Sequence, residues 1–214
     1  MKRSFFLLLT IIGFYNFSYA QSDRYTTTMK ANIAQLDSIV FKNNGNELAN
    51  TFTRIGDAEK TQWLPYYYAA YSIVMQALLD TDVSKKDAMA EKAKELITKA
   101  EAITGKENSE TAVIKAMIAT VQMTVDPQSR FMTYGALINE NIQKSQTLDA
   151  TNPRPLLLQA QNTFYTPEQF GGGKDAAKTY FDQAKEKFDS FKPETELSPS
   201  WGKSSLDYFL EQYK

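Results

Sequence analysis

The sequence predicts an all-α fold, a solenoid of about four antiparallel helix pairs that is closed by a C-terminal capping helix. Three observations lead to this prediction. Apolar residues recur at spacings of three and four along most of the chain, which is the period of an α-helix, and no segment alternates convincingly with the period of a strand. The seven prolines fall outside these periodic runs or at their starts. Turns rich in Asn, Gly and Pro separate the runs.

The first twenty residues have the features of a cleaved export signal. Two basic residues precede a mostly apolar stretch, Phe5 to Phe14, and a small-x-small cleavage site ends at Ala20. Ten apolar residues rise about 15 Å as a helix, half of the roughly 30 Å hydrocarbon core, so a membrane anchor or a buried first helix is the weaker interpretation. We expect residues 1–20 to be removed and the mature protein to be periplasmic or secreted, with no transmembrane segment after cleavage.

The mature chain opens with four apolar stripes at helical spacing. The first spans residues 29–40, and the Asn43–Asn46 turn separates it from the second, at 48–55. Pro65 marks the start of the third, at 63–78, because proline is tolerated in the first turn of a helix. Ser84 is the expected N-cap of the fourth, at 89–103.

Five further stripes complete the chain. Ser109 is the expected cap before the fifth, at 114–121, and Phe131, Ile138, Ile142 and Leu148 make the sixth. Two prolines open the seventh, at 157–164, and the eighth spans 177–191. We therefore expect a helical-repeat domain over 21–191, a loop over 192–202 that contains two Pro, two Ser and one Gly, and a capping helix within 203–214.

The helix pairs resemble those of the tetratricopeptide repeat (TPR) family. The joint from Leu148 to Pro153 reads Leu-Asp-Ala-Thr-Asn-Pro and is similar to the family's Leu-Asp-Pro-Asn-Asn-Pro-like joint, with Ala150 in place of proline. Tyr67, Ala70 and Tyr71 follow the family's first-helix pattern. The repeat step is longer here than in the family, and a non-repeating helical bundle is the alternative. The resemblance, over about residues 25–191, implies a right-handed superhelix and an exported, non-catalytic scaffold that binds a protein or peptide on its concave face.

The resemblance also implies which side chains would contact the partner. First helices line the concave surface in this family, and the corresponding residues here are Tyr68, Ser72, Met75, Lys115, Gln122, Asn162 and Tyr165. Only Lys115 and Asn162 match residue types of the family's clamp for a peptide carboxylate. A complete clamp is therefore not expected.

A glycine-rich turn precedes the eighth stripe. Gly171, Gly172, Gly173 and Lys174 form a candidate anion-binding turn, because backbone N–H groups at a helix start attract anions. It is not a P-loop, since Glu168 occupies the first glycine position of that motif. The alternative is a structural turn that needs the conformational freedom of glycine. The segment from Tyr165 to Gly173 also resembles a turn in the helical-repeat T component of TRAP transporter systems, which implies a periplasmic small-ligand binding or delivery module as the alternative function.

Composition excludes several kinds of chemistry. The 214 residues contain no His and no Cys, which excludes a catalytic triad with histidine, a thiolate nucleophile and metal sites built on either side chain. The balance of 24 basic and 25 acidic residues argues against a nucleic-acid partner. Ser200 and Lys203 match a Ser-x-x-Lys motif, but its companion motifs are missing. We expect no enzyme activity, no catalytic residue, no bound metal and no cofactor.

Overall fold

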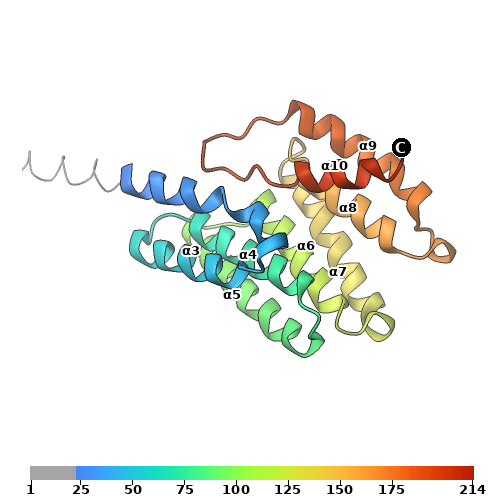
Figure 1. Cartoon of the computed structure of the whole chain (residues 1–214), viewed down its shortest axis with the longest axis horizontal. Helices are drawn as coiled ribbons and strands as arrows, with labels where there is room; N and C mark the ends of the chain where they lie inside the picture. Colours follow the sequence, from blue (N-terminus) through green and yellow to red (C-terminus); the bar gives the residue numbers. More distant parts are fainter. Residues whose placement is uncertain (1–22) are drawn as a thin grey trace, which may run out of the picture.

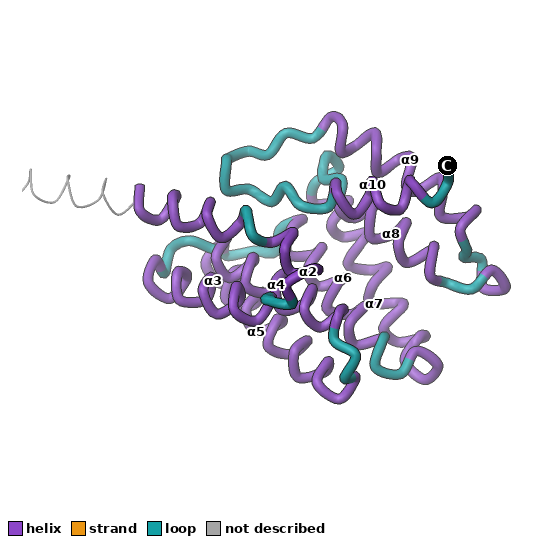
Figure 2. The backbone as a smooth tube through the Cα atoms, in the orientation of Figure 1, coloured by secondary structure: helices purple, strands orange, loops and turns teal. Residues whose placement is uncertain are grey.

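A computed structural model describes residues 23–214 as a chain of helices joined by short turns (Figures 1 and 2). No strand occurs within this range, so the all-α prediction is confirmed for it. No helix in the described part of the chain is both long enough and apolar enough to cross a bilayer. The expected signal peptide, residues 1–20, lies outside the described residues.

The helices pack largely in the order in which they occur. Helical residues 23–33 are followed by two short elements, η1 (Leu36–Ser38) and α2 (Ile39–Lys42). The hairpins that follow are α3 (Gly45–Glu59) with α4 (Leu64–Leu79), α4 with α5 (Lys86–Thr104), α6 (Ser109–Met123) with α7 (Pro127–Leu148), and α8 (Arg154–Tyr165) with α9 (Lys174–Ser190). Helix α10 (Lys203–Glu211) lies on α9, and η2 (Val83–Lys85) and η3 (Glu168–Phe170) occupy two of the turns. The right-handed superhelix stays a prediction.

Helix starts follow the expected chemistry with small shifts. Pro65 and Pro155 are the second residues of α4 and α8, where a missing N–H costs nothing. The cap of α6 is Asn108, one residue before the expected Ser109, because its side chain and that of Thr111 form a reciprocal capping box. Ser84 does not cap α5, since it lies inside η2, whose own cap is Asp82.

Two expectations about the apolar stripes are wrong. The stripe 29–40 is not one helix, because the first helix ends at residue 33 and the chain re-enters helical structure only at η1 and α2, leaving Val40 52% exposed. On α7, only Ile138 and Ile142 of the expected stripe are buried, whereas Phe131 and Leu148 are 43% and 47% exposed. The longest helix of the described residues thus buries this stripe only in its middle.

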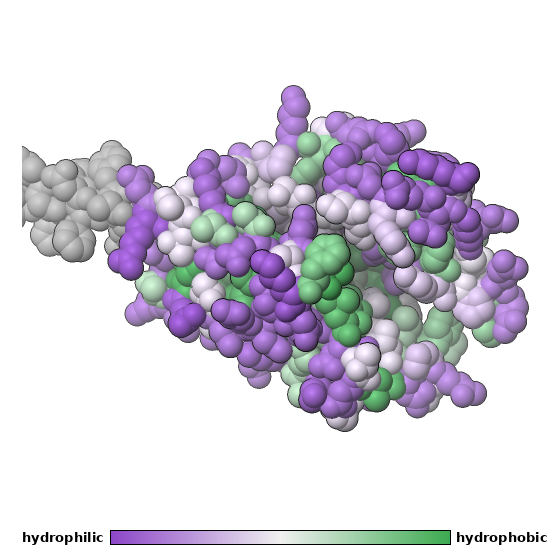
Figure 3. All heavy atoms as spheres, viewed as in Figure 1, coloured by the Kyte–Doolittle hydropathy of each residue, from purple (hydrophilic) through white to green (hydrophobic). Residues whose placement is uncertain are grey.

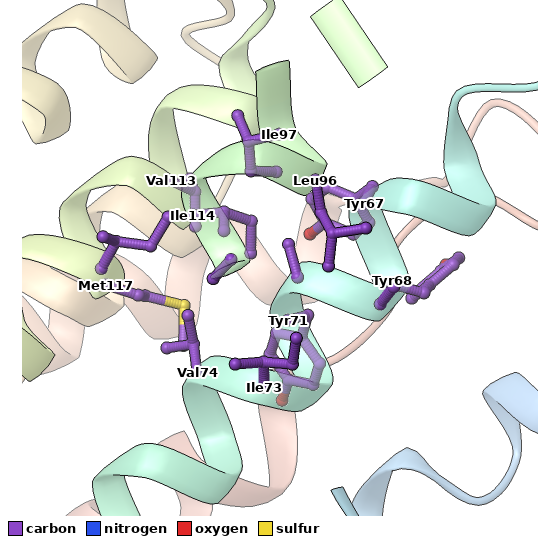
Figure 4. Packing of buried hydrophobic residues seen from close by; sticks show 14 of the residues in the cluster. Tyr67, Tyr68, Tyr71, Ile73, Val74, Leu96, Ile97, Val113, Ile114 and Met117 are labelled. Atoms are coloured by element: carbon purple, nitrogen blue, oxygen red, sulfur yellow. The ribbon is translucent and has the colours of Figure 1, made fainter. Parts of the chain in front are cut away.

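The buried side chains form two separate clusters. The first core is built from the helices between residue 23 and α7, together with Leu158 of α8. Figure 4 shows its centre, where Tyr67 and Tyr71 of α4 face Ile97 of α5 and Ile114 of α6. The second core lies between α8, α9 and α10, and its buried members are Leu157, Ala160, Ala177, Phe181, Ala184, Leu206 and Phe209. Two residues of the loop before α10, Leu197 and Trp201, belong to the first core.

Candidate functional site

The face of the molecule in Figure 3 is hollowed between its two halves, with hydrophobic side chains around the hollow. In Figure 1, α2 and the end of α4 border this region on one side, and the end of α8 with η3 borders it on the other. These same elements, together with the start of α7 and with α10, carry most of the large hydrophobic side chains that remain exposed in the described residues: Val40, Phe41, Leu79, Phe131, Met132, Tyr165, Phe170 and Tyr208. Large apolar groups left in water on elements that border one hollow indicate a candidate binding surface.

The side of the hollow formed by α2 and the end of α4 is the N-terminal lip, and its main residue is Phe41. This side chain is 88% exposed, although α2 itself packs on α4. The attachment is polar and specific: the Gln76 side chain accepts a hydrogen bond from the Gly45 backbone N–H at 3.0 Å and donates one to Asn43. A Cβ at Gly45 would lie 2.6 Å from the Ser72 carbonyl oxygen, so glycine permits the close approach that places Phe41 here.

The opposite side is the C-terminal lip, defined by Phe131, Tyr165, Phe170 and Tyr208. The rings of Phe131 and Phe170 are 6.3 Å apart, so the start of α7 meets η3. Tyr165 and Tyr208 both pack edge-on against the buried Phe209, at 5.9 and 5.5 Å. Burial, and then the neighbouring Tyr208, raise the pKa of Tyr165, which keeps its hydroxyl protonated at neutral pH. The C-terminal lip is therefore aromatic and uncharged.

The basic residues of this region differ in whether their side chains are engaged by other groups of the protein. Arg130 forms a two-pronged ion pair with Asp87, at 2.6 and 2.8 Å, and holds the pKa of that carboxyl below its usual value. Lys174 donates to the Gln212 carbonyl and lies over the Tyr213 ring. Lys42, the last residue of α2, is exposed beside Phe41. Lys42 is therefore the exposed cation of the N-terminal lip.

Two of the residues expected on the concave face are not accessible. Tyr68 is fully buried, stacks on Phe52 at 5.4 Å and donates a hydrogen bond to the Leu197 carbonyl at 2.7 Å. Ser72 is also fully buried and bonds to the Tyr68 carbonyl within the same helix. The loop before α10 and helix α3 cover this part of α4, so these residues present no surface to a partner.

The expected residues on α4 and α6 have internal partners. Met75 is half-buried against the first core. Lys115 is bonded to Glu101 and Glu107 at 2.8 Å each, so its charge is already neutralised on the side of α6 that faces α5. The side chain of Gln122 reaches toward Glu91 of α5. The two residue types of the peptide clamp are thus not brought together for a carboxylate.

The expected residues on α8 lie at its end. Asn162 is partly exposed, and its backbone carbonyl accepts both the N–H and the hydroxyl of Thr166, which ends the helix. Tyr165 is 72% exposed and belongs to the C-terminal lip. Tyr165 is therefore the most exposed of the seven residues expected to contact a partner, and it borders the hollow.

The glycine turn uses its backbone N–H groups internally. Those of Gly171, Gly172 and Gly173 donate to the carbonyls of Glu168, Pro167 and Thr163, so none is left to bind an anion. The glycines are required for shape: two have positive φ, 81° and 98°, and a Cβ on Gly172 would lie 2.2 Å from a backbone oxygen. Their consequence for the site is Phe170, which the turn holds 67% exposed on the C-terminal lip.

Within residues 23–214 no group of His, Cys, Asp and Glu has an arrangement that could hold a metal ion. Most of the lip residues escape sequence analysis, because Phe41 and Tyr208 belong to no apolar stripe and Phe131 fits a stripe without being buried. The sequence signal for these residues is the opposite of the one that identifies a core. Large apolar residues that fall outside the helical period, near helix ends, mark exposed surface rather than core.

Comparison with known proteins identifies a solved relative. Neither the family models nor the curated proteins compared with the chain match it. The structure is similar to that of the HusA haemophore from Porphyromonas gingivalis, with a TM-score of 0.78 and 32% sequence identity over 89% of this chain and 92% of that chain. The TPR resemblance is not confirmed as family membership. Identity at this level over nearly the whole length of both proteins shows common descent, and the chain belongs to the family of the HusA haemophore.

Proposed function

We propose that this protein is an exported, non-enzymatic carrier that binds haem or a closely related porphyrin in the hollow between the two lips. The observation that carries the proposal is the pair of exposed apolar lips, in a chain whose solved relative is a haemophore. A porphyrin is flat, apolar over both faces and acidic at one edge. These properties suit aromatic side chains on two sides of a hollow, with Lys42 at its border.

The mode of binding follows from the composition. The chain has no His and no Cys, so the commonest ligands of haem iron are absent. Apolar burial then carries the affinity. Covering one exposed Phe stabilises a complex by about 1.5–3 kcal/mol, and association itself costs about 4–15 kcal/mol. Several lip residues are needed together to exceed that cost, and Tyr165 and Tyr208 are the lip side chains of a type that can also bond to haem iron.

The decisive experiment titrates the mature protein with haem and with metal-free protoporphyrin. Phe41→Ala and Phe170→Ala should each weaken binding of both ligands about tenfold, since each removes roughly 1.4 kcal/mol or more of apolar contact. Leu148→Ala is the control, because Leu148 is an apolar residue, 47% exposed, at the end of α7 away from the lip. If the wild-type protein binds haem but not metal-free protoporphyrin, the apolar mechanism is overturned. If it binds neither ligand, the proposed function is overturned.

The second candidate function is a scaffold that binds a protein or peptide. Among the described residues, the surface left to support it is the pair of lips. Peptide binding at Tyr68 and Ser72 conflicts with their burial. A partner would have to dock on the lips themselves, where Phe41 projects into solvent. Cross-linked capture from the cell envelope, run with wild type and with Phe41→Ala, tests it: a protein retained by wild type only, in the absence of porphyrin, would favour a scaffold over a carrier.

A further inference from the structure

The two lips of the hollow belong mainly to different cores, with Phe131 of the C-terminal lip as the exception, because it lies on α7 of the first core. The N-terminal lip is carried by α2 and α4, which pack in the first core, and most of the C-terminal lip is carried by α8, η3 and α10 around the second. The width of the hollow therefore depends on how the two cores are held together. The loop 192–202, called the strap from here on, leaves α9, crosses to α4 and returns to α10 (Figure 1).

The strap passes from one core to the other between two adjacent residues. Trp201 is buried in the first core, with its ring 4.6 Å from that of Tyr71. The next residue, Gly202, has φ 110° and lies against the second core, where a Cβ would be 2.8 Å from Phe188 and 3.1 Å from Leu157. Only glycine fits this position, so the Trp-Gly pair is a fixed junction between the cores.

A buried polar ring closes around this junction. The indole N–H of Trp201 donates to the Tyr67 hydroxyl at 2.8 Å, and that hydroxyl donates to Glu110 at 2.8 Å. Glu110 pairs with Arg154 at 3.3 Å, and Arg154 donates to the carbonyl of Pro199, back in the strap. The ring thus joins the strap to α4, α6 and α8.

Stability alone does not explain this buried polar ring. The Arg154 side chain is fully buried, and its Nε has no hydrogen-bond partner. Burial also raises the pKa of Glu110, with Arg154 acting in the opposite direction. A buried ion pair often stabilises no better than apolar side chains of the same size, and its best-supported use is to select one geometry. The geometry selected here is the placement of α8 and the strap on α4.

We propose that the ring of Trp201, Tyr67, Glu110, Arg154 and Pro199 is a positioning clasp that sets the separation of the two lips. It touches no ligand in the proposed site. Opening it lets the second core move relative to the first, so that only a fraction of molecules has the hollow at the width that binds. The proposal rests on the proposed function for its effect on affinity, but its effect on lip separation is independent of any ligand.

The absence of cysteine allows a direct test. Cysteines introduced at the exposed Lys42 and Asp207, in α2 and α10, carry spin labels across the hollow, and pulsed electron spin resonance measures their separation. The labelled proteins serve the distance measurement alone, and haem binding is measured on clasp variants that keep both native residues, because Lys42 belongs to the proposed site. The clasp variants are Trp201→Phe and Tyr67→Phe. The first keeps an aromatic side chain but removes the indole N–H donor, and the second removes the hydroxyl. Ile138→Val, a cavity in the first core on α7, a helix that carries no member of the clasp, is the control for lost stability.

Both clasp variants should broaden or shift the label separation and weaken haem binding about three- to tenfold, as expected when the competent fraction falls to roughly a third or a tenth. The control should lower the melting temperature and leave both readouts unchanged. A separation that is identical in wild type and both clasp variants would overturn the clasp. Wild type that binds no haem, with a separation that still broadens in the variants, would overturn the proposed function and leave the clasp standing.

Discussion

Neighbouring residues on α10 give a sharp test of how this protein divides stability from binding. Phe209 is 5% exposed and Tyr208 is 62% exposed, although they are adjacent in the sequence. The Phe209 ring stacks on Phe181 at 4.9 Å and meets Phe164 edge-on at 5.2 Å. It therefore lies at the centre of the second core, whereas Tyr208 lies on the C-terminal lip.

Phe209→Ala should cost about 3–5 kcal/mol, the usual range for a buried Phe replaced by Ala. This is a large part of a typical total stability of about 5–15 kcal/mol, and the second core is the smaller of the two. Tyr208→Ala should change stability by no more than about 0.5 kcal/mol, as expected for an exposed side chain. It should weaken porphyrin binding, because it removes part of the lip.

Urea unfolding followed by two signals checks this reasoning. Trp63 packs on the first core, whereas Trp201 joins the two cores. Trp63 fluorescence in a Trp201→Phe background therefore reports the first core, while circular dichroism reports all helices. In Phe209→Ala the dichroism transition should begin at lower urea than the fluorescence transition, since the second core unfolds first. A loss below about 1 kcal/mol would refute the packing argument. Coincident transitions would refute the independence of the two cores.

Three further outcomes are expected. Gly135→Ala in α7 should stabilise the protein by up to about 1 kcal/mol, since a Cβ there meets only ordinary contacts at 3.9 Å; a lower melting temperature would contradict this. Gly56→Ala in α3 should destabilise it by about 1–2 kcal/mol despite the same gain in propensity, because the new Cβ would lie 2.8 Å from the Tyr66 ring; thermal unfolding of the pair is the measurement. Burial acts to raise the pKa of Glu107, but hydrogen bonds from two lysines outweigh it and hold that pKa below its usual value. The stabilisation is therefore present above the usual carboxyl pKa and is lost as pH falls through the lowered one, so Glu107→Gln should be less stable than wild type by about 1 kcal/mol at pH 7, with the difference closing in acid. The exposed Glu95→Gln is the control, and a difference that is constant with pH would contradict the assignment.

The fold was predictable where one face of a helix is buried along its whole length. Helix α5 shows this well, because Ala93, Ile97 and Ala100 recur at helical spacing and all three are buried. Periodicity fails where a helix is buried only in part. Phe131 and Ile138 of α7 share one stripe, but only the second lies under a neighbouring helix. Sequence spacing states which residues share a face and says nothing about how far the neighbour extends along it.

The candidate site was largely unpredictable because it depends on contacts between segments far apart in the chain. The expected position of Tyr68 on an open surface is wrong, since Leu197, 129 residues later, lies over it and accepts its hydrogen bond. No pattern near Tyr68 indicates this. The Ser-Trp-Gly-Lys stretch, which matched a catalytic motif, instead supplies Trp201 to one core and Gly202 to the other.

The absence of histidine and the presence of the clasp belong to one physical argument. Without a histidine or cysteine bond to iron, the affinity proposed here is mainly a sum of small apolar contacts, and such a sum depends on how many contacts are made at once. A hollow that widens slightly loses contacts on one lip while it keeps them on the other. The separation of the lips then controls release as well as binding, so a carrier of this kind gains more from fixing two cores relative to each other than from any single strong contact with its ligand.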